Sequence, residues 1–269
     1  MKKLYKEIFE LHQGMISGVI ITVVKTEGSG PSKTGTKMIV YSSGETLGTV
    51  GGGTIEMLAI EKAKSIFKTE ENELVKYDLD DDTNGQKTNM ICGGNATLFY
   101  EYFAPKNHIY IFGAGHIGKE LVYHLKDLDY FITVIDNRKD VLEGIGGADK
   151  KIFGKFKDAL SDQEVLPNSY FIIATYEHNY DSIVLNKIYK SDWKPKYIGM
   201  VSSRNKKEII YNKLRSEVSN PDLSYCYLPV GLDIGGTTPA EIAISIISEI
   251  QTIRYGKVGN HLRDTKNKK

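Results

Sequence analysis

Cysteine is scarce in this chain of 269 residues: only Cys92 and Cys226 occur, 134 positions apart. Without a Cys-x-x-Cys pair the sequence offers neither a disulfide framework nor a zinc ribbon, and a reducing compartment is favoured. Long apolar runs are also absent. The longest, residues 15–24, is interrupted and shorter than the roughly 20 residues that span a bilayer. The sequence therefore predicts a soluble cytoplasmic protein that does not enter a membrane.

The net charge is also close to zero: the chain has 35 Lys and Arg residues and 34 Asp and Glu residues, which gives a formal charge of +1. Such a balance leaves no global electrostatic footprint for nucleic acid or an anionic membrane. Proline is modest at 7 residues, so disorder is not indicated. Glycine alone is in excess, with 26 residues or about 10%, against about 7% in average proteins. The positions of these glycines therefore indicate where a functional site is expected.

Apolar periodicity divides the chain into two predicted domains with a boundary near residue 105. Residues 1–105 indicate a mixed α+β domain, with helices at 3–12 and 55–67 and strands at 18–24, 36–41, 46–50 and 96–103. Residues 106–258 indicate a Rossmann-like, doubly wound parallel sheet. There we expect strands at 108–112, 131–135, 170–174, 197–201 and 224–228, and helices at 117–128, 181–189, 206–218 and 240–255. Residues 259–269 are expected to form a frayed tail.

The sharpest motif is Gly113-Ala-Gly115-His-Ile-Gly118, which follows a predicted strand and opens a predicted helix. Gly113 suits a tight turn, Gly115 lets a pyrophosphate approach the backbone, and Gly118 lets the helix pack closely. His116 fills a variable position inside this motif and is counted as a pocket candidate. The alternative is a nucleotide-type fold whose site is unused or takes another phosphate ligand.

Asp136 stands 21 positions after Gly115, at the end of the next predicted strand, where an acid can bond a ribose 2′-hydroxyl. An acid there disfavours a 2′-phosphate, although the neighbouring Arg138 leaves that possibility open. The motif therefore points to a dinucleotide such as NAD(H).

Two further glycine clusters also lead into predicted helices. Gly51, Gly52 and Gly53 can form a nest of N–H groups for an anion, and a tight turn without a ligand explains them equally well. The segment 231–241 ends in Thr238-Pro-Ala-Glu241, a capping-box start for the last helix. Three such entrances suggest more than one phosphate or anion.

Three polar residues near strand ends are candidates for chemistry. His178, just beyond a predicted strand, is the best-placed acid or base, although no partner at fixed spacing accompanies it. Ser202 and Arg204 stand at another helix entrance and suit anion capture, or form an ordinary polar loop.

Cys92 is followed by Gly93 and Gly94, whose small size would let a ligand or metal reach the sulfur. An isolated cysteine is more often a small buried hydrophobe. We assign that structural role to Cys226, which lies in an apolar strand.

In their order along the chain, these motifs resemble the XdhC/CoxI family, the accessory factors of xanthine dehydrogenase and related molybdenum hydroxylases. The segments that carry the resemblance are 26–31, 48–53, 91–94, 112–118, 136–138, 198–204, 229–235 and 238–243. Most of these motifs are generic singly, and their order makes the assignment specific.

The resemblance implies a homodimer that binds the molybdenum cofactor, allows its sulfuration with a cysteine desulfurase, and delivers it to the apo-hydroxylase. It makes Cys92 the candidate thiol near molybdenum. Many members carry a cysteine directly after the three glycines, where this chain has Thr54. An NAD(H)-dependent oxidoreductase of unknown substrate is the alternative function, because both ligands present phosphate to the glycine motif.

Overall fold

The computed structural model describes residues 2–12, 14, 16–28, 33–78, 94–163 and 165–265. The chain forms two compact units, Met1–Lys106 and Asn107–Lys269. Within the described ranges, no helix combines the length and apolar character needed to cross a membrane.

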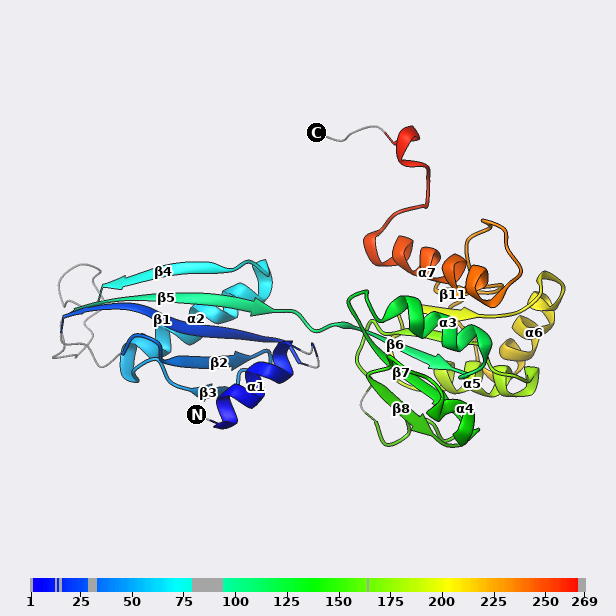
Figure 1. Cartoon of the computed structure of the whole chain (residues 1–269), viewed down its shortest axis with the longest axis horizontal. Helices are drawn as coiled ribbons and strands as arrows, with labels where there is room; N and C mark the ends of the chain where they lie inside the picture. Colours follow the sequence, from blue (N-terminus) through cyan, green and yellow to red (C-terminus); the bar gives the residue numbers. More distant parts are fainter. Residues whose placement is uncertain are drawn as a thin grey trace. The chain divides into compact units, whose positions relative to one another are not determined.

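The first unit is an antiparallel sheet with a helix on each face (Figure 1). The sheet order is β3-β2-β1-β5-β4, and β1 pairs with β5 along its whole length. In chain order its elements are α1 (Lys2–His12), β1 (Gly18–Gly28), β2 (Lys37–Tyr41), β3 (Thr46–Gly48), α2 (Gly53–Thr69), β4 (Glu73–Asp78) and β5 (Gly94–Phe103).

Alternation along the central strands explains why both faces of this sheet are covered. Val19 and Ile21 of β1 pack with the apolar face of α2, including Ile55. Ile20, between them in sequence, points to the other face and packs against Leu11 of α1. The loop that precedes α2 is thereby fixed at one end of the sheet.

The second unit is a parallel sheet of six strands, in the order β11-β10-β9-β6-β7-β8. Its elements are β6 (Asn107–Phe112), α3 (His116–Leu125), β7 (Tyr130–Asp136), α4 (Lys139–Glu143), β8 (Lys150–Phe153), β9 (Tyr170–Ile173), α5 (His178–Lys190), β10 (Tyr197–Met200), η1 (Arg204–Lys206), α6 (Lys207–Glu217), β11 (Cys226–Tyr227), α7 (Pro239–Tyr255) and η2 (Leu262–Asp264). These findings confirm the expected fold class, a mixed α+β domain followed by a doubly wound parallel sheet.

Helices cover both faces of the parallel sheet. One buried cluster joins α3, α4 and α7 to the sheet and includes Leu121, Leu142 and Ile246. The other joins α5 and α6 to the opposite face and includes Leu185 and Leu214. Figure 1 shows α3 and α7 side by side above the strands.

Strand order reverses at β6, because β7 lies on one side of it and β9, reached by a later crossover, on the other. Ligands of open parallel sheets bind at such a switch point, outside the carboxyl ends of the strands. The loops after β6, β7 and β9 therefore define where a ligand site is expected.

Candidate functional site

The glycine motif after β6 contains two glycines that the fold requires and one, Gly115, that it does not. A Cβ atom at Gly113, where φ is +115°, would lie 2.1 Å from the carbonyl oxygen of Ala174. A Cβ at Gly118 would lie 2.0 Å from the carbonyl oxygen of Gly113. Both contacts are impossible, so these two glycines allow β6, β9 and α3 to approach one another.

Gly115 has no such steric reason to be glycine. Its φ is −70°, and a Cβ there would meet nothing nearer than Nη2 of Arg138, at 4.0 Å. Gly115 is also the N-cap of α3, and no side chain of the described residues caps this helix end. Backbone N–H groups at the start of α3 are thus presented to open space, as anion binding requires.

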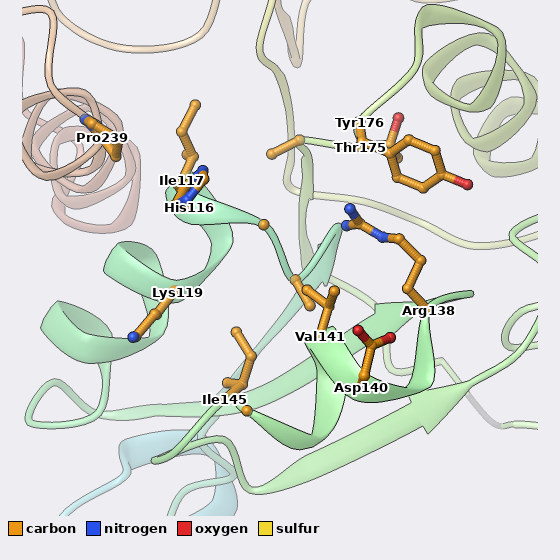
Figure 2. A pocket seen from close by; sticks show the side chains of 14 residues that line it. His116, Ile117, Lys119, Arg138, Asp140, Val141, Ile145, Thr175, Tyr176 and Pro239 are labelled. Carbon is orange, nitrogen blue, oxygen red and sulfur yellow. The ribbon is translucent and has the colours of Figure 1, made fainter.

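A pocket of about 650 Å³ lies in front of this helix end (Figure 2). Its walls come from the glycine loop and α3, from Arg138 and α4 after β7, and from the loop 174–176 after β9. The pocket therefore lies at the topological switch point. His116 lies exposed on its wall, as does Lys119.

Asp136 ends β7 as expected, and its side chain is completely buried. Its carboxylate accepts four hydrogen bonds: Oδ1 from the backbone N (2.9 Å) and Nε (3.0 Å) of Arg138, and Oδ2 from Nη2 of Arg138 (2.8 Å) and the backbone N of Ala114 (2.7 Å). Burial works against ionisation, but these bonds outweigh it and hold the pKa of Asp136 below its ordinary value. The carboxylate thus anchors the glycine loop and Arg138.

Arg138 is fixed in place by two neighbours. Besides its forked pairing with Asp136, its guanidinium stacks over the ring of Tyr176, 4.1 Å from the ring centroid. Figure 2 shows the side chain reaching from the end of β7 toward the start of α3, beside that ring. Tyr176 in turn accepts a hydrogen bond from Nδ2 of Asn137, at 3.2 Å. Sequence reasoning did not single out Tyr176.

In the glycine cluster of the first unit, Gly52 donates its backbone N–H to Glu56 of α2, and Gly51 donates its own to Oγ1 of Thr49. Oε2 of Glu56 accepts hydrogen bonds from the backbone N of Val50 (3.3 Å) and of Gly52 (3.2 Å), and from Oγ1 of Thr49. A carboxylate of the chain itself thus stands where Gly51, Gly52 and Gly53 were expected to hold an anion. Thr54 lies in the first turn of α2.

At the start of α7, too, a side chain of the protein accepts hydrogen bonds from backbone N–H groups. Thr238 and Glu241 form the expected capping box, with Thr238 Oγ1 accepting from the backbone N of Glu241. Oε2 of Glu241 also accepts from the backbone N of Thr237 and of Thr238, both at 2.9 Å. Of these three helix starts, α7 has a side-chain cap, whereas α2 and α3 have none among the described residues.

Ser202 and Arg204 follow β10, outside the pocket at the glycine motif. Arg204 pairs with Asp233 through Nη2 and Oδ2, 3.0 Å apart, and both side chains are exposed. A smaller cavity of about 390 Å³ lies between Arg204 and the segment 229–236. The hydroxyl of Ser202 donates to the carbonyl oxygen of Ser203, at 3.4 Å.

His178 has partners that its sequence context did not reveal. Its Nδ1 lies 3.5 Å from Oδ2 of Asp181, which is almost fully buried, and its Nε2 contacts Nζ of Lys206. Asp181 also accepts hydrogen bonds from the backbone N and the hydroxyl of Thr175. Burial raises the pKa of Asp181, against the opposing effect of these hydrogen bonds. Because Thr175 lines the pocket, this chain of contacts ends at the pocket wall.

Cys92, the candidate thiol, lies outside the described residues, as do Gly93 and residues 29–31 of the first motif. No group of three or more His, Cys, Asp or Glu residues suited to a metal occurs in the described part of the chain. Cys226 is buried, and burial raises the pKa of its thiol, in keeping with the structural role assigned to it.

The fold and the pocket define a class: a Rossmann domain, joined to an α+β domain, with an open pocket at its glycine motif. A family model described as the XdhC Rossmann domain matches residues 109–250, which is more than half of the chain. A second model, described as the XdhC and CoxI family, matches residues 13–78. The chain therefore belongs to the XdhC and CoxI family.

Two curated proteins are similar to this chain. An uncharacterized protein of Escherichia coli K12, YqeB, is 25% identical over 264 residues, which is 95% of this chain and 47% of YqeB. A Bacillus subtilis protein described as a probable xanthine dehydrogenase subunit is 29% identical over 155 residues, 57% of this chain and 44% of that protein. The chain thus spans just under half the length of the curated relatives that it matches.

A solved structure shares the fold. The crystal structure of a xanthine dehydrogenase from Bacillus halodurans superimposes with a TM-score of 0.51 at 20% identity, covering 97% of both chains. This likeness concerns the fold alone.

Proposed function

We propose that this protein is an accessory factor of xanthine dehydrogenase or a related molybdenum hydroxylase. In this role it binds the molybdenum cofactor, allows sulfuration of the cofactor with a cysteine desulfurase, and delivers it to the apo-enzyme as a homodimer. Membership in the XdhC and CoxI family supports the proposal. The similarity to a Bacillus subtilis protein described as a probable xanthine dehydrogenase subunit supports it as well.

The observation that carries the proposal is the open end of α3. Glu241 accepts from the backbone N–H groups before α7, and Glu56 accepts from that of Gly52 before α2, whereas the start of α3 at Gly115 has no side-chain cap and faces a pocket of about 650 Å³. The phosphate of the cofactor's pterin tail is an anion of the kind that a helix N-terminus binds. Gly115 would contact that end of the cofactor, and Gly113 and Gly118 would shape the loop that presents it.

When bound, the cofactor carries the molybdenum centre with which the hydroxylase oxidises its substrate. Thiolates are the protein ligands that suit soft metals. We therefore retain Cys92 as the candidate thiol near molybdenum and the segment 51–53 as a candidate contact of the cofactor. In that case Glu56 would have to release the N–H groups that it now occupies.

An activation assay tests delivery. The protein, loaded anaerobically with the molybdenum cofactor, is mixed with the purified apo form of a molybdenum hydroxylase, and hydroxylase activity is followed. We expect the loaded protein to restore activity faster than the same concentration of free cofactor, and loaded protein with Gly115→Ala to lose that advantage. Equal activation by free cofactor would contradict a delivery role.

A second candidate, an NAD(H)-dependent oxidoreductase, is favoured by one observation. The exposed His178 is oriented by the buried Asp181 and lies beside a loop that lines the pocket, as a proton-transfer group would. Thermal protection by NADH, followed by NADH turnover with candidate substrates, would support this function. If NADH does not raise the melting temperature of the protein, an NAD(H)-dependent oxidoreductase function is excluded.

A further inference from the structure

The acid that ends β7 has no capacity left for a ligand. A carboxylate has about four acceptor positions, and Asp136 uses four for Ala114 and Arg138. Its side chain is also completely buried. A ribose diol, which would have to donate hydrogen bonds to this carboxylate, finds no acceptor there.

Arg138 presents donors at the same corner of the pocket. Nε and Nη2 bond Asp136, while Nη1 has no hydrogen-bond partner among the described residues. Nη2 lies 4.0 Å from the Cβ position of Gly115, so the guanidinium borders the space in front of α3. The stack on Tyr176 and the fork on Asp136 fix the orientation of this donor edge before any ligand arrives.

Lys119 and Asp140 are the other formally charged side chains in the wall of this pocket. His116 and Lys119 line the pocket from α3, and the uncapped end of that helix adds partial positive charge. Asp140, exposed on α4, is the carboxylate in the pocket wall. The N–H donors of Arg138 and of the open end of α3 match a phosphate better than a hydroxyl, because a phosphate oxyanion only accepts.

We propose that the pocket selects ligands that carry a phosphate monoester, and that Arg138 is the residue that reads it. The monoester is either the terminal phosphate of the ligand or a phosphate on a ribose hydroxyl. This inference rests on the proposed function, because it names the group by which the pocket would hold the cofactor. It also makes Arg138, rather than Asp136, the specificity-determining residue at the end of β7.

Three small probes separate the possibilities: adenosine, 5′-AMP with a terminal phosphate, and 2′-AMP with a phosphate on the ribose. Each is titrated into the full-length protein by calorimetry at fixed salt. We expect at least one of the monophosphates to bind about tenfold or more tighter than adenosine, the size of a charge-assisted hydrogen bond. The tighter of the two identifies the position of the phosphate. Equal affinity of all three probes, or no detectable binding of either monophosphate, overturns the inference.

Substitutions assign the preference to Arg138. In Arg138→Gln we expect the preference for the monophosphate to fall about tenfold or more, whereas Arg138→Lys, which keeps the charge but lacks the fork, retains part of it. Lys139→Gln removes the same charge from the next residue, whose exposed side chain pairs with Glu143 outside the pocket, and should leave the preference unchanged. An undiminished preference in both Arg138 variants overturns the assignment.

Retention of the molybdenum cofactor is measured on the same preparations. A monophosphate preference without cofactor retention overturns the proposed function and leaves the phosphate site standing. Cofactor retention without that preference overturns the phosphate site alone.

Discussion

The guanidinium of Arg138 donates two parallel hydrogen bonds to the carboxylate of Asp136, from Nε to Oδ1 at 3.0 Å and from Nη2 to Oδ2 at 2.8 Å. Because Oδ2 also accepts from the backbone N of Ala114, the pair connects the end of β7 to the glycine loop after β6. Breaking a buried ion pair is costly, since an uncompensated polar group is left behind. The pair thus stabilises the fold and shapes the pocket at once.

Asp136→Asn tests the structural part of this pairing. An amide N–H₂ in place of one oxygen would face the donors of Arg138 or Ala114, so we expect a loss of about 3 kcal/mol of unfolding free energy at pH 7. The pKa of Asp136 is lowered from its ordinary 3.8. The stabilisation is therefore fully present above about pH 3.8 and is lost as the pH falls through the folded-state pKa.

Denaturant unfolding at a series of pH values measures this effect. The difference between wild type and Asp136→Asn should narrow as the pH is taken below 3.8. Asp140→Asn, at an exposed carboxylate nearby, serves as control and should change stability by less than about 0.5 kcal/mol. A difference that does not vary with pH would show that the charge of Asp136 is not what stabilises the fold.

Gly115→Ala should separate ligand binding from folding. The backbone at Gly115 suits alanine, and the nearest atom that a Cβ there would meet is Nη2 of Arg138, at 4.0 Å, so we expect a cost of about 1 kcal/mol or less. The added methyl group occupies the space in front of α3, so retention of the cofactor should fall at least tenfold. Thermal unfolding and cofactor content measure the two effects.

Gly113→Ala is the matched comparison. Its Cβ would lie 2.1 Å from the carbonyl oxygen of Ala174 at a φ of +115°. We expect it to cost at least about 2 kcal/mol. If Gly115→Ala destabilises as much as Gly113→Ala, then Gly115 serves the fold and not a ligand.

Cys92→Ser tests the thiol that the family resemblance singles out. Serine lacks the soft sulfur, so we expect the purified variant to keep less than about a tenth of the wild-type molybdenum content. The comparison variant is Cys226→Ser, at a buried thiol whose pKa is raised by burial. Equal molybdenum content in Cys92→Ser and wild type would remove Cys92 from the site.

His178→Gln distinguishes the two candidate functions. For an accessory factor, we expect cofactor retention to stay within about twofold of wild type, because His178 lies outside the pocket wall. For an oxidoreductase, loss of a general acid or base should slow turnover about a hundredfold or more. His124→Gln, at a partly buried histidine on α3 beside Glu120, is the control for removing an imidazole elsewhere in this unit.

Most of the fold could be predicted from the sequence, because central strands and amphipathic helices carry strong apolar periodicity. Two strands and one α-helix were missed, besides the two short 3-10 helices η1 and η2. β4 and β8 are edge strands with few buried side chains, and α4 is only five residues long, too short to show a period. Edge strands pair on one side only, so little apolar sequence marks them.

The site was predictable only in part. The glycine motif is a local signal, and the spacing to Asp136 is regular. The sequence could not show which hydrogen-bonding groups already have partners within the chain. Glu56 accepts the N–H of Gly52 in the first unit, and Arg138 donates to both carboxylate oxygens of Asp136. These outcomes depend on side-chain rotamers. Lys206 is 28 positions from His178, and the two side chains come into contact because β10 pairs with β9 in the sheet.

Cofactor content is the most direct test of the central claim. Wild type and Gly115→Ala are purified anaerobically from a host that produces the molybdenum cofactor, and molybdenum and oxidised pterin are measured per chain. The account predicts about one pterin per chain for wild type and less than about a tenth of that for Gly115→Ala, with both proteins folded. Wild type without pterin, or Gly115→Ala with as much pterin as wild type, would contradict it.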